Sequence, residues 1–180
     1  MQRKIINPVI QDTVTFVRTS AETAGRFTEL VLTLRPGGGP PPHFHTRFTE
    51  TFTAIEGELV INTSAAQPLV LRPGDSYTVP IGAVHSFTNA SAQEITFRAV
   101  IRPGHEGFEN SLRLVYGLAA DGLTDAKSVP KQFTHLAIMA VLGDLNLPGL
   151  RRVLAPVLRW VAHRAQRKGT MQALLAKYLI

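Results

Sequence analysis

Two histidines and a glutamate lie close together in the segment Gly37–Gly57, GGGPPPHFHTRFTETFTAIEG. Residues i and i+2 of a strand point to the same face, so His43 and His45 can direct two imidazoles at one point. Glu50 follows His45 by five residues, an odd separation that would turn its side chain away in an unbroken strand. We therefore expect a turn or bulge just after His45, which brings the carboxylate to the two imidazoles. Together these groups are suitable ligands for a divalent metal ion.

A second segment, Gly74–Asn89, supplies another histidine, His85, in a strand that follows a Pro-Ile-Gly turn. The two segments fit G-x5-H-x-H-x4-E-x6-G and G-x5-P-x-G-x2-H-x3-N with no position missing. These patterns resemble the two signature motifs of the cupin superfamily. The resemblance implies a small jelly-roll barrel, the cupin double-stranded β-helix, with one metal ion inside. The residues at the matching ligand positions are His43, His45, Glu50 and His85.

Histidines that only cap or fill the barrel are the alternative, but four ligand residues at the required spacings favour a metal site. The chain has no Cys, which leaves nitrogen and oxygen ligands. Four protein ligands in an octahedral shell leave two positions for water, substrate or dioxygen. Iron(II) or manganese(II) is the expected ion, while nickel, copper, cobalt and zinc accept the same ligands.

The resemblance implies two classes of function. The first is a metal-dependent oxidoreductase of the dioxygenase type that acts on a small phenolic, enolic or diketone compound. Glu50 would then be both a metal ligand and a catalytic base. The second is a cupin that binds or senses a small molecule without turnover.

Three further residues are candidates for substrate binding. Phe52 shares the strand parity of Glu50, and Phe87 shares that of His85, so both can line a cavity beside the metal. Arg47 could anchor a substrate carboxylate or phosphate. The alternative is that the two phenylalanines fill the barrel and that Arg47 is a solvated charge.

The elements that must position these residues are short strands separated by Pro, Gly, Ser and Asn. Strands are predicted over residues 12–20, 26–34, 48–55, 58–63, 68–71, 76–79, 85–89 and 94–101. In the last of them Ile95, Phe97, Ala99 and Ile101 alternate and should face inward. Many short strands at near-regular spacing predict an all-β jelly roll.

After Arg102-Pro103-Gly104 the apolar period changes to 3.6 residues, which predicts helices. They are expected over residues 107–120, 133–142, 150–161 and 170–180, with a kink or a fresh start at Pro156. We therefore divide the chain into a cupin barrel, residues 1–104, and a helical extension, residues 105–180, packed on the barrel or on a dimer partner. The histidines outside the motifs, His105, His135 and His163, are predicted to be surface or helix residues.

Charge is concentrated at the end of the chain. Residues 1–147 hold 12 basic and 13 acidic side chains, whereas residues 148–180 hold seven basic side chains and no acidic one. A basic amphipathic helix can contact an anionic membrane surface or nucleic acid. We favour the simpler interpretation, in which its stripe of Leu and Val packs on the barrel or on a dimer partner and the basic groups are solvated.

The distribution of apolar segments predicts the oligomeric state and the cellular location of the protein. The segment 133–142 is nearly all apolar, and a monomer would expose it as a large patch, so a homodimer is expected. The N-terminus lacks the apolar core of a signal peptide, and no apolar run approaches ~20 residues. These features predict a cytoplasmic protein without a membrane span.

Overall fold

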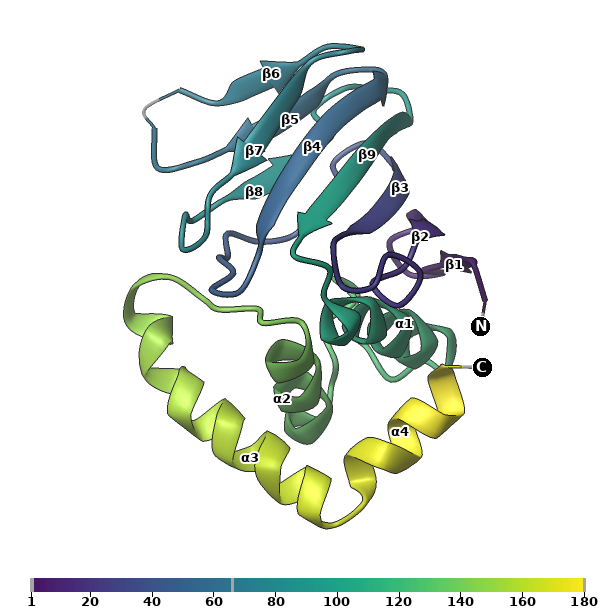
Figure 1. Ribbon diagram of the computed structural model, residues 1–180, viewed down its shortest axis with the longest axis vertical. Helices are drawn as coiled ribbons and strands as arrows, with labels where there is room; N and C mark the ends of the chain where they lie inside the picture. Colours follow the sequence, from purple (N-terminus) through teal and green to yellow (C-terminus); the bar gives the residue numbers. More distant parts are fainter. Residues whose placement is uncertain (1, 66, 180) are drawn as a thin grey trace.

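The computed structural model describes residues 2–65 and 67–179. Strands gather at one end of the molecule and helices at the other (Figure 1). The strands are β1 (Lys4–Ile6), β2 (Thr13–Arg18), β3 (Thr28–Leu34), β4 (Thr49–Glu56), β5 (Leu59–Asn62), β6 (Leu69–Leu71), β7 (Ser76–Val79), β8 (Ser86–Thr88) and β9 (Ile95–Arg102). The helices are α1 (Glu106–Ala120), α2 (Phe133–Leu142), α3 (Ala155–Arg167) and α4 (Thr170–Tyr178), with a 3-10 turn at Gly149–Leu154.

The strands form two antiparallel sheets. One has six strands in the order β1-β2-β3-β9-β4-β7, and the other has three in the order β6-β5-β8. This arrangement confirms the predicted double-stranded β-helix with helices after it. Within the described residues the strands remain in these two sheets and do not close into one continuous ring.

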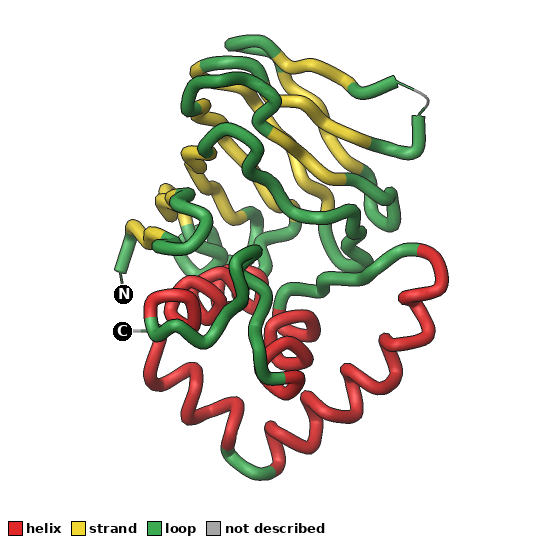
Figure 2. Tube along the Cα trace, turned by 180° about the vertical axis from the view of Figure 1, so that it is seen from behind, coloured by secondary structure: helices red, strands yellow, loops and turns green. Residues whose placement is uncertain are grey.

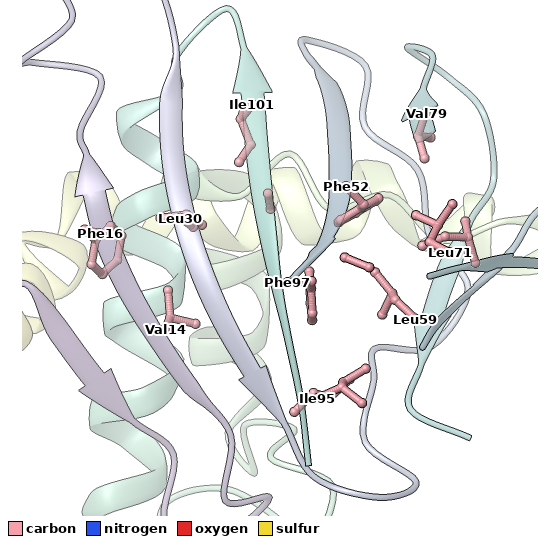
Figure 3. Close-up of a cluster of buried hydrophobic side chains, with 14 of the residues drawn as sticks. Val14, Phe16, Leu30, Phe52, Leu59, Leu71, Val79, Ile95, Phe97 and Ile101 are labelled. Carbon is pink, nitrogen blue, oxygen red and sulfur yellow. The ribbon is translucent and has the colours of Figure 1, made fainter. Parts of the chain in front are cut away.

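The space between the sheets is filled by the side chains that alternate inward. Ile95, Phe97, Ala99 and Ile101 of β9 are buried, as predicted. They meet side chains of β4 and β5, and the close-up shows Phe97 between Phe52 and Ile95 (Figure 3). Period-two alternation in β9 therefore supplies the centre of the core.

β1 was not predicted. It has three residues, and of these only Ile5 is buried, where it pairs with Val14 of β2. A segment this short shows no measurable alternation, so its strand conformation depends on pairing with β2.

The helices build a second apolar cluster. α3 and α4 form an outer arm around α2, and α4 reaches back to α1 (Figures 1 and 2). The buried members of this cluster are Leu114, Leu118, Ala137, Ile138, Ala162, Ala165 and Met171. Pro156 lies in the first turn of α3, so the predicted fresh start is confirmed; proline fits there because its missing N–H has no intrahelical partner to lose.

α1 attaches the helices to the six-stranded sheet through buried polar groups. The carboxylate of Glu109 accepts hydrogen bonds from the Ser20 backbone N–H and from the Thr28 hydroxyl, both at 2.6 Å. The guanidinium of Arg113 lies 3.6 Å from the centre of the Phe16 ring, a cation–π contact.

The apolar stripe predicted for residues 150–161 divides between two environments. Leu158 and Val161 pack against the second cluster, whereas Val153 is 71% exposed and Val157 46% exposed. These two valines are therefore not covered by the described part of this chain, and their packing on a dimer partner stays a prediction. The side chain of Leu150 lies outside the described residues.

α2 is covered within the chain, because it contacts both α1 and α3. Its buried residues include His135, Ala137, Ile138 and Ala140, while Phe133 at its start is 47% exposed. The large exposed patch on which the homodimer prediction rested is therefore mostly covered, and the homodimer stays a prediction. Among the described residues, none of the helices combines the length and the apolar character needed to cross a membrane.

Candidate metal centre

The two motif segments are joined directly by their histidines. The backbone N–H of His43 donates to the carbonyl of His85 at 2.9 Å, and the N–H of His85 donates to the carbonyl of His43 at 2.8 Å. Glu50 faces the same interior from β4, where it pairs with Val79 and Ile101 of the flanking strands. Backbone pairing thus brings ligands that are 35 to 42 residues apart in sequence into one place.

The chain bends immediately after His45, as predicted. Thr46 and Arg47 form the bend, and their backbone N–H groups donate to Oδ2 of Asp144 at 2.5 and 2.9 Å. A carboxylate that accepts two adjacent N–H groups fixes the local backbone in the same way as a helix cap. The bend corrects the strand parity, so Glu50 can face the histidines.

The four predicted ligands come together. Their candidate ligand atoms all lie within 4.8 Å of one another, and all four residues are buried. Oε2 of Glu50 is 2.9 Å from Nε2 of His85 and 3.3 Å from Nε2 of His45. Three imidazoles and one carboxylate at this spacing can hold one metal ion.

The outer nitrogen of each imidazole is held by a backbone carbonyl. A carbonyl oxygen can only accept, so each Nδ1 carries the proton and each Nε2 presents a lone pair. Such anchoring fixes the tautomer and orients a metal-binding histidine. The contacts are His43 with Pro41 at 2.9 Å, His45 with Asp144 at 3.0 Å and His85 with Ala83 at 3.1 Å.

With the proton on Nδ1, the surroundings of each Nε2 lone pair show whether these residues fit a metal ion. An Nε2 lone pair that faces a carboxylate oxygen is repelled unless a proton or a cation lies between them. Nε2 of His45 is buried and, within the described part of the chain, makes no well-aligned hydrogen bond, although Glu50 lies 3.3 Å away. A divalent cation at the centre would satisfy these lone pairs together, so the donor set fits a metal ion.

The electrostatic environment shifts the pKa of three of the four candidate ligands. Burial lowers the pKa of His43 to about 4, and the neighbouring His45 and His85 add to this shift. Burial alone would raise the pKa of Glu50, but its contacts with His45 and His85 outweigh burial and lower the pKa. Burial alone would lower the pKa of His45, but its contact with Glu50 raises it. At neutral pH, Glu50 is therefore ionised and His43 is neutral.

The three candidate substrate residues lie at different depths. The ring of Phe52 is fully buried, 6.2 Å from the His85 ring and 5.3 Å from the Phe87 ring. Phe87 is half-buried and packs against the main core. Arg47 is exposed on the bend. Their roles toward a substrate stay predictions.

Sequence reasoning missed the loop between α2 and α3. Asp144 supplies both the carboxylate of the bend and the carbonyl that orients His45. Asn146 pairs with Phe44 through two backbone hydrogen bonds of 2.9 and 3.0 Å. The loop runs below the motif segment in Figure 1, about a hundred positions away in sequence. A single sequence carries no local signal for such a contact.

Replacing Asp144 by Ala should weaken metal affinity by about 10–100-fold, the usual effect of removing support behind a metal ligand. The bend would lose its acceptor, and the carbonyl that orients His45 would become mobile. Asp144→Asn keeps an acceptor oxygen and tolerates the positive φ of 49° at this position, so it should bind metal more tightly than Asp144→Ala. Isothermal titration with manganese(II) or zinc(II) measures the effect.

Asp125→Ala is the matched control. Asp125 also accepts two loop N–H groups, those of Lys127 and Val129, but it is not among the contacts of the metal-ligand cluster. Equal losses of metal affinity in Asp125→Ala and Asp144→Ala would refute a specific role for Asp144.

Metal affinity should also fall as the pH is lowered. The raised pKa of His45 means that the metal-free site holds a proton there up to a higher pH than an ordinary imidazole does, and metal must displace it. Lowering the pH favours the proton, so affinity should drop ~10-fold per pH unit for one displaced proton. His43, with a pKa of about 4, adds to this loss only under more acidic conditions. Titrations in buffers of different ionisation enthalpy measure the proton release, and a pH-independent affinity would contradict this prediction.

Comparison with known proteins agrees with this geometry. Residues 30–101 match the family model of the cupin domain. Germin-like protein subfamily 1 member 4 of Arabidopsis thaliana is 32% identical over 108 residues, which cover 54% of this chain and 46% of that protein. Oxidoreductase OpS7 of Beauveria bassiana is 35% identical over 79 residues, which cover 40% of this chain and 26% of that protein. The chain thus spans about half or less of the length of the curated relatives that it matches.

Among solved structures, an RmlC-like cupin from Shewanella frigidimarina superposes with a TM-score of 0.50 at 20% identity. The superposition covers 59% of this chain and 89% of that one, and it shows a shared fold. Residues 30–101 therefore carry a cupin domain.

Proposed function

We propose that the protein is a metal-dependent oxidoreductase of the dioxygenase type that acts on a small phenolic, enolic or diketone compound. The observation that carries the proposal is the buried cluster of three histidines and Glu50, with each Nδ1 held by a carbonyl and with Nε2 of His45 and of His85 beside Oε2 of Glu50. A bound iron(II) or manganese(II) ion would supply Lewis acidity and one-electron chemistry. The similarity to a fungal protein named an oxidoreductase supports this class.

The residues of the chain have separate tasks in this proposal. The three imidazoles would hold the metal ion. Oε2 of Glu50 faces His45 and His85, so the other carboxylate oxygen can accept the proton of an enol or a phenol. The Phe48 ring stacks on His45 at 4.4 Å between centroids and limits the access of water.

The test is oxygen uptake by protein loaded with iron(II) or manganese(II), in the presence of catechol, a stable enol or acetylacetone. We expect uptake that depends on one of these compounds and is lost in Glu50→Gln, with the metal content of that variant measured in parallel. Metal-loaded protein that consumes no oxygen with any of these compounds would contradict the proposal.

A cupin that binds or senses a small molecule without turnover is the second candidate. The feature that favours it is the burial of the ligands, since the side chains of His45, Glu50 and His85 are only 3%, 6% and 2% exposed. Saturable binding of a panel compound without oxygen uptake would favour this class over the oxidoreductase.

A further inference from the structure

A cavity of about 230 Å3 lies between the bend after His45 and helix α3. Thr46 and Arg47 form one side, the loop from Asp144 to Leu147 forms the back, and residues of α3 form the other side. None of the four candidate metal ligands lines it. The cavity is therefore a separate site, and the backbone of Asp144 stands between it and His45.

Three cationic or basic side chains line this cavity. Arg47 comes from the bend, and Arg159 and His163 come from α3, four residues apart and hence on one face of the helix. All three residues are exposed, and their side chains make no hydrogen bond or ion pair with other residues that the structure describes. These groups are free to pair with an anion.

Asp144 is the acidic residue in the lining, and its carboxylate is already engaged. The carboxylate accepts from the N–H and hydroxyl of Thr46, the N–H of Arg47 and the amide of Asn146. Two arginines against one saturated carboxylate leave the cavity net positive even when His163 is neutral.

The rest of the lining is mainly apolar. Ala140, Val141, Leu145, Leu147, Ala155 and Leu158 contribute to it. Leu158 and Val141 also pack against the second apolar cluster, so this wall is supported from behind. A volume of about 230 Å3 is below the ~300 Å3 at which pockets for drug-sized ligands begin, so the cavity suits a smaller molecule.

We propose that this cavity binds a small organic acid, whose carboxylate pairs with Arg47, Arg159 and His163 and whose short aliphatic body lies against Leu145 and Leu158. Arginine suits a carboxylate because its guanidinium forms two parallel hydrogen bonds with the two oxygens. Two basic side chains of α3, Arg159 and His163, thus recognise a ligand. Binding needs no metal, so the proposal is independent of the proposed oxidoreductase activity.

The experiment is isothermal titration of the full-length protein with octanoate, with octan-1-ol and inorganic phosphate as probes of the apolar and anionic parts. We expect 1:1 binding of octanoate, with weaker binding of both other probes. Arg159→Gln and Arg47→Gln should each weaken octanoate binding by about tenfold or more, since each removes a charge-assisted contact. Arg167→Gln removes an exposed charge from the same helix but outside the cavity lining, so it should leave the affinity unchanged.

Circular dichroism melts establish that each variant is folded. Three outcomes would overturn the proposal: no octanoate binding at millimolar concentration, octan-1-ol or phosphate binding as tightly as octanoate, or an equal loss of affinity in Arg167→Gln. Because octanoate binding is measured on metal-free protein as well, failure here is distinguishable from failure of the oxidoreductase proposal.

Discussion

Replacing His85 by Ala should abolish tight metal binding. His85 supplies an inward Nε2 2.9 Å from Oε2 of Glu50, and its backbone pairs with His43. Alanine keeps the backbone pairing but removes the ligand, so the affinity should fall by more than the ~10–100-fold typical of residues behind the ligands. Metal content after dialysis and isothermal titration with manganese(II) measure the loss.

His163→Ala is the matched control, because it removes an exposed imidazole that is not part of the metal-ligand cluster. This variant should bind metal as the original protein does. If His85→Ala still retains one equivalent of metal through dialysis, the assignment of His85 as a ligand is wrong.

Replacing Phe97 by Ala should lower the free energy of unfolding by about 3–5 kcal/mol, the range for removing a fully buried aromatic ring. Phe97 is 0% exposed and lies on β9, between β3 and β4 (Figure 3). Its ring is 5.2 Å from that of Phe87 and 6.1 Å from that of Phe52, so its loss opens a cavity where several rings meet. Urea unfolding followed by circular dichroism measures the change.

The control for this stability prediction is Phe133→Ala, at the start of α2, where the residue is 47% exposed. Removal of a half-exposed ring leaves no closed cavity, so the loss should be much smaller than for Phe97→Ala. Equal losses would mean that Phe97 does not have the central place in the core that its burial indicates.

The sequence predicts those parts of the fold that have a local period. β4 and β9 alternate clearly, and their predicted bounds, 48–55 and 94–101, differ by one residue from Thr49–Glu56 and Ile95–Arg102. The bend after His45 was also predictable, because the odd spacing to Glu50 cannot bring both side chains to one face without it. The ligand cluster follows from these two features together with the motif that contains His85.

The parts that were missed depend on contacts between distant segments. β1 is a strand because it pairs with β2, and Asp144 reaches the bend from about a hundred positions away. The exposed position of Val157 follows from how α3 docks on α2, which the helical period of one segment does not determine. The sequence period predicts which face of a helix or strand is apolar. Which part of that face becomes buried depends on how the element packs against its neighbours.

The most direct test of the central claim is the position of the metal in crystals. Protein loaded with one equivalent of zinc(II) or manganese(II) should be crystallised, and diffraction should be recorded on both sides of the absorption edge of the metal. We expect a single strong anomalous peak per chain, ~2.0–2.2 Å from the ligand atoms of His43, His45, Glu50 and His85 when the metal is zinc. A strong peak elsewhere on the chain, with none among these four residues, would contradict the account.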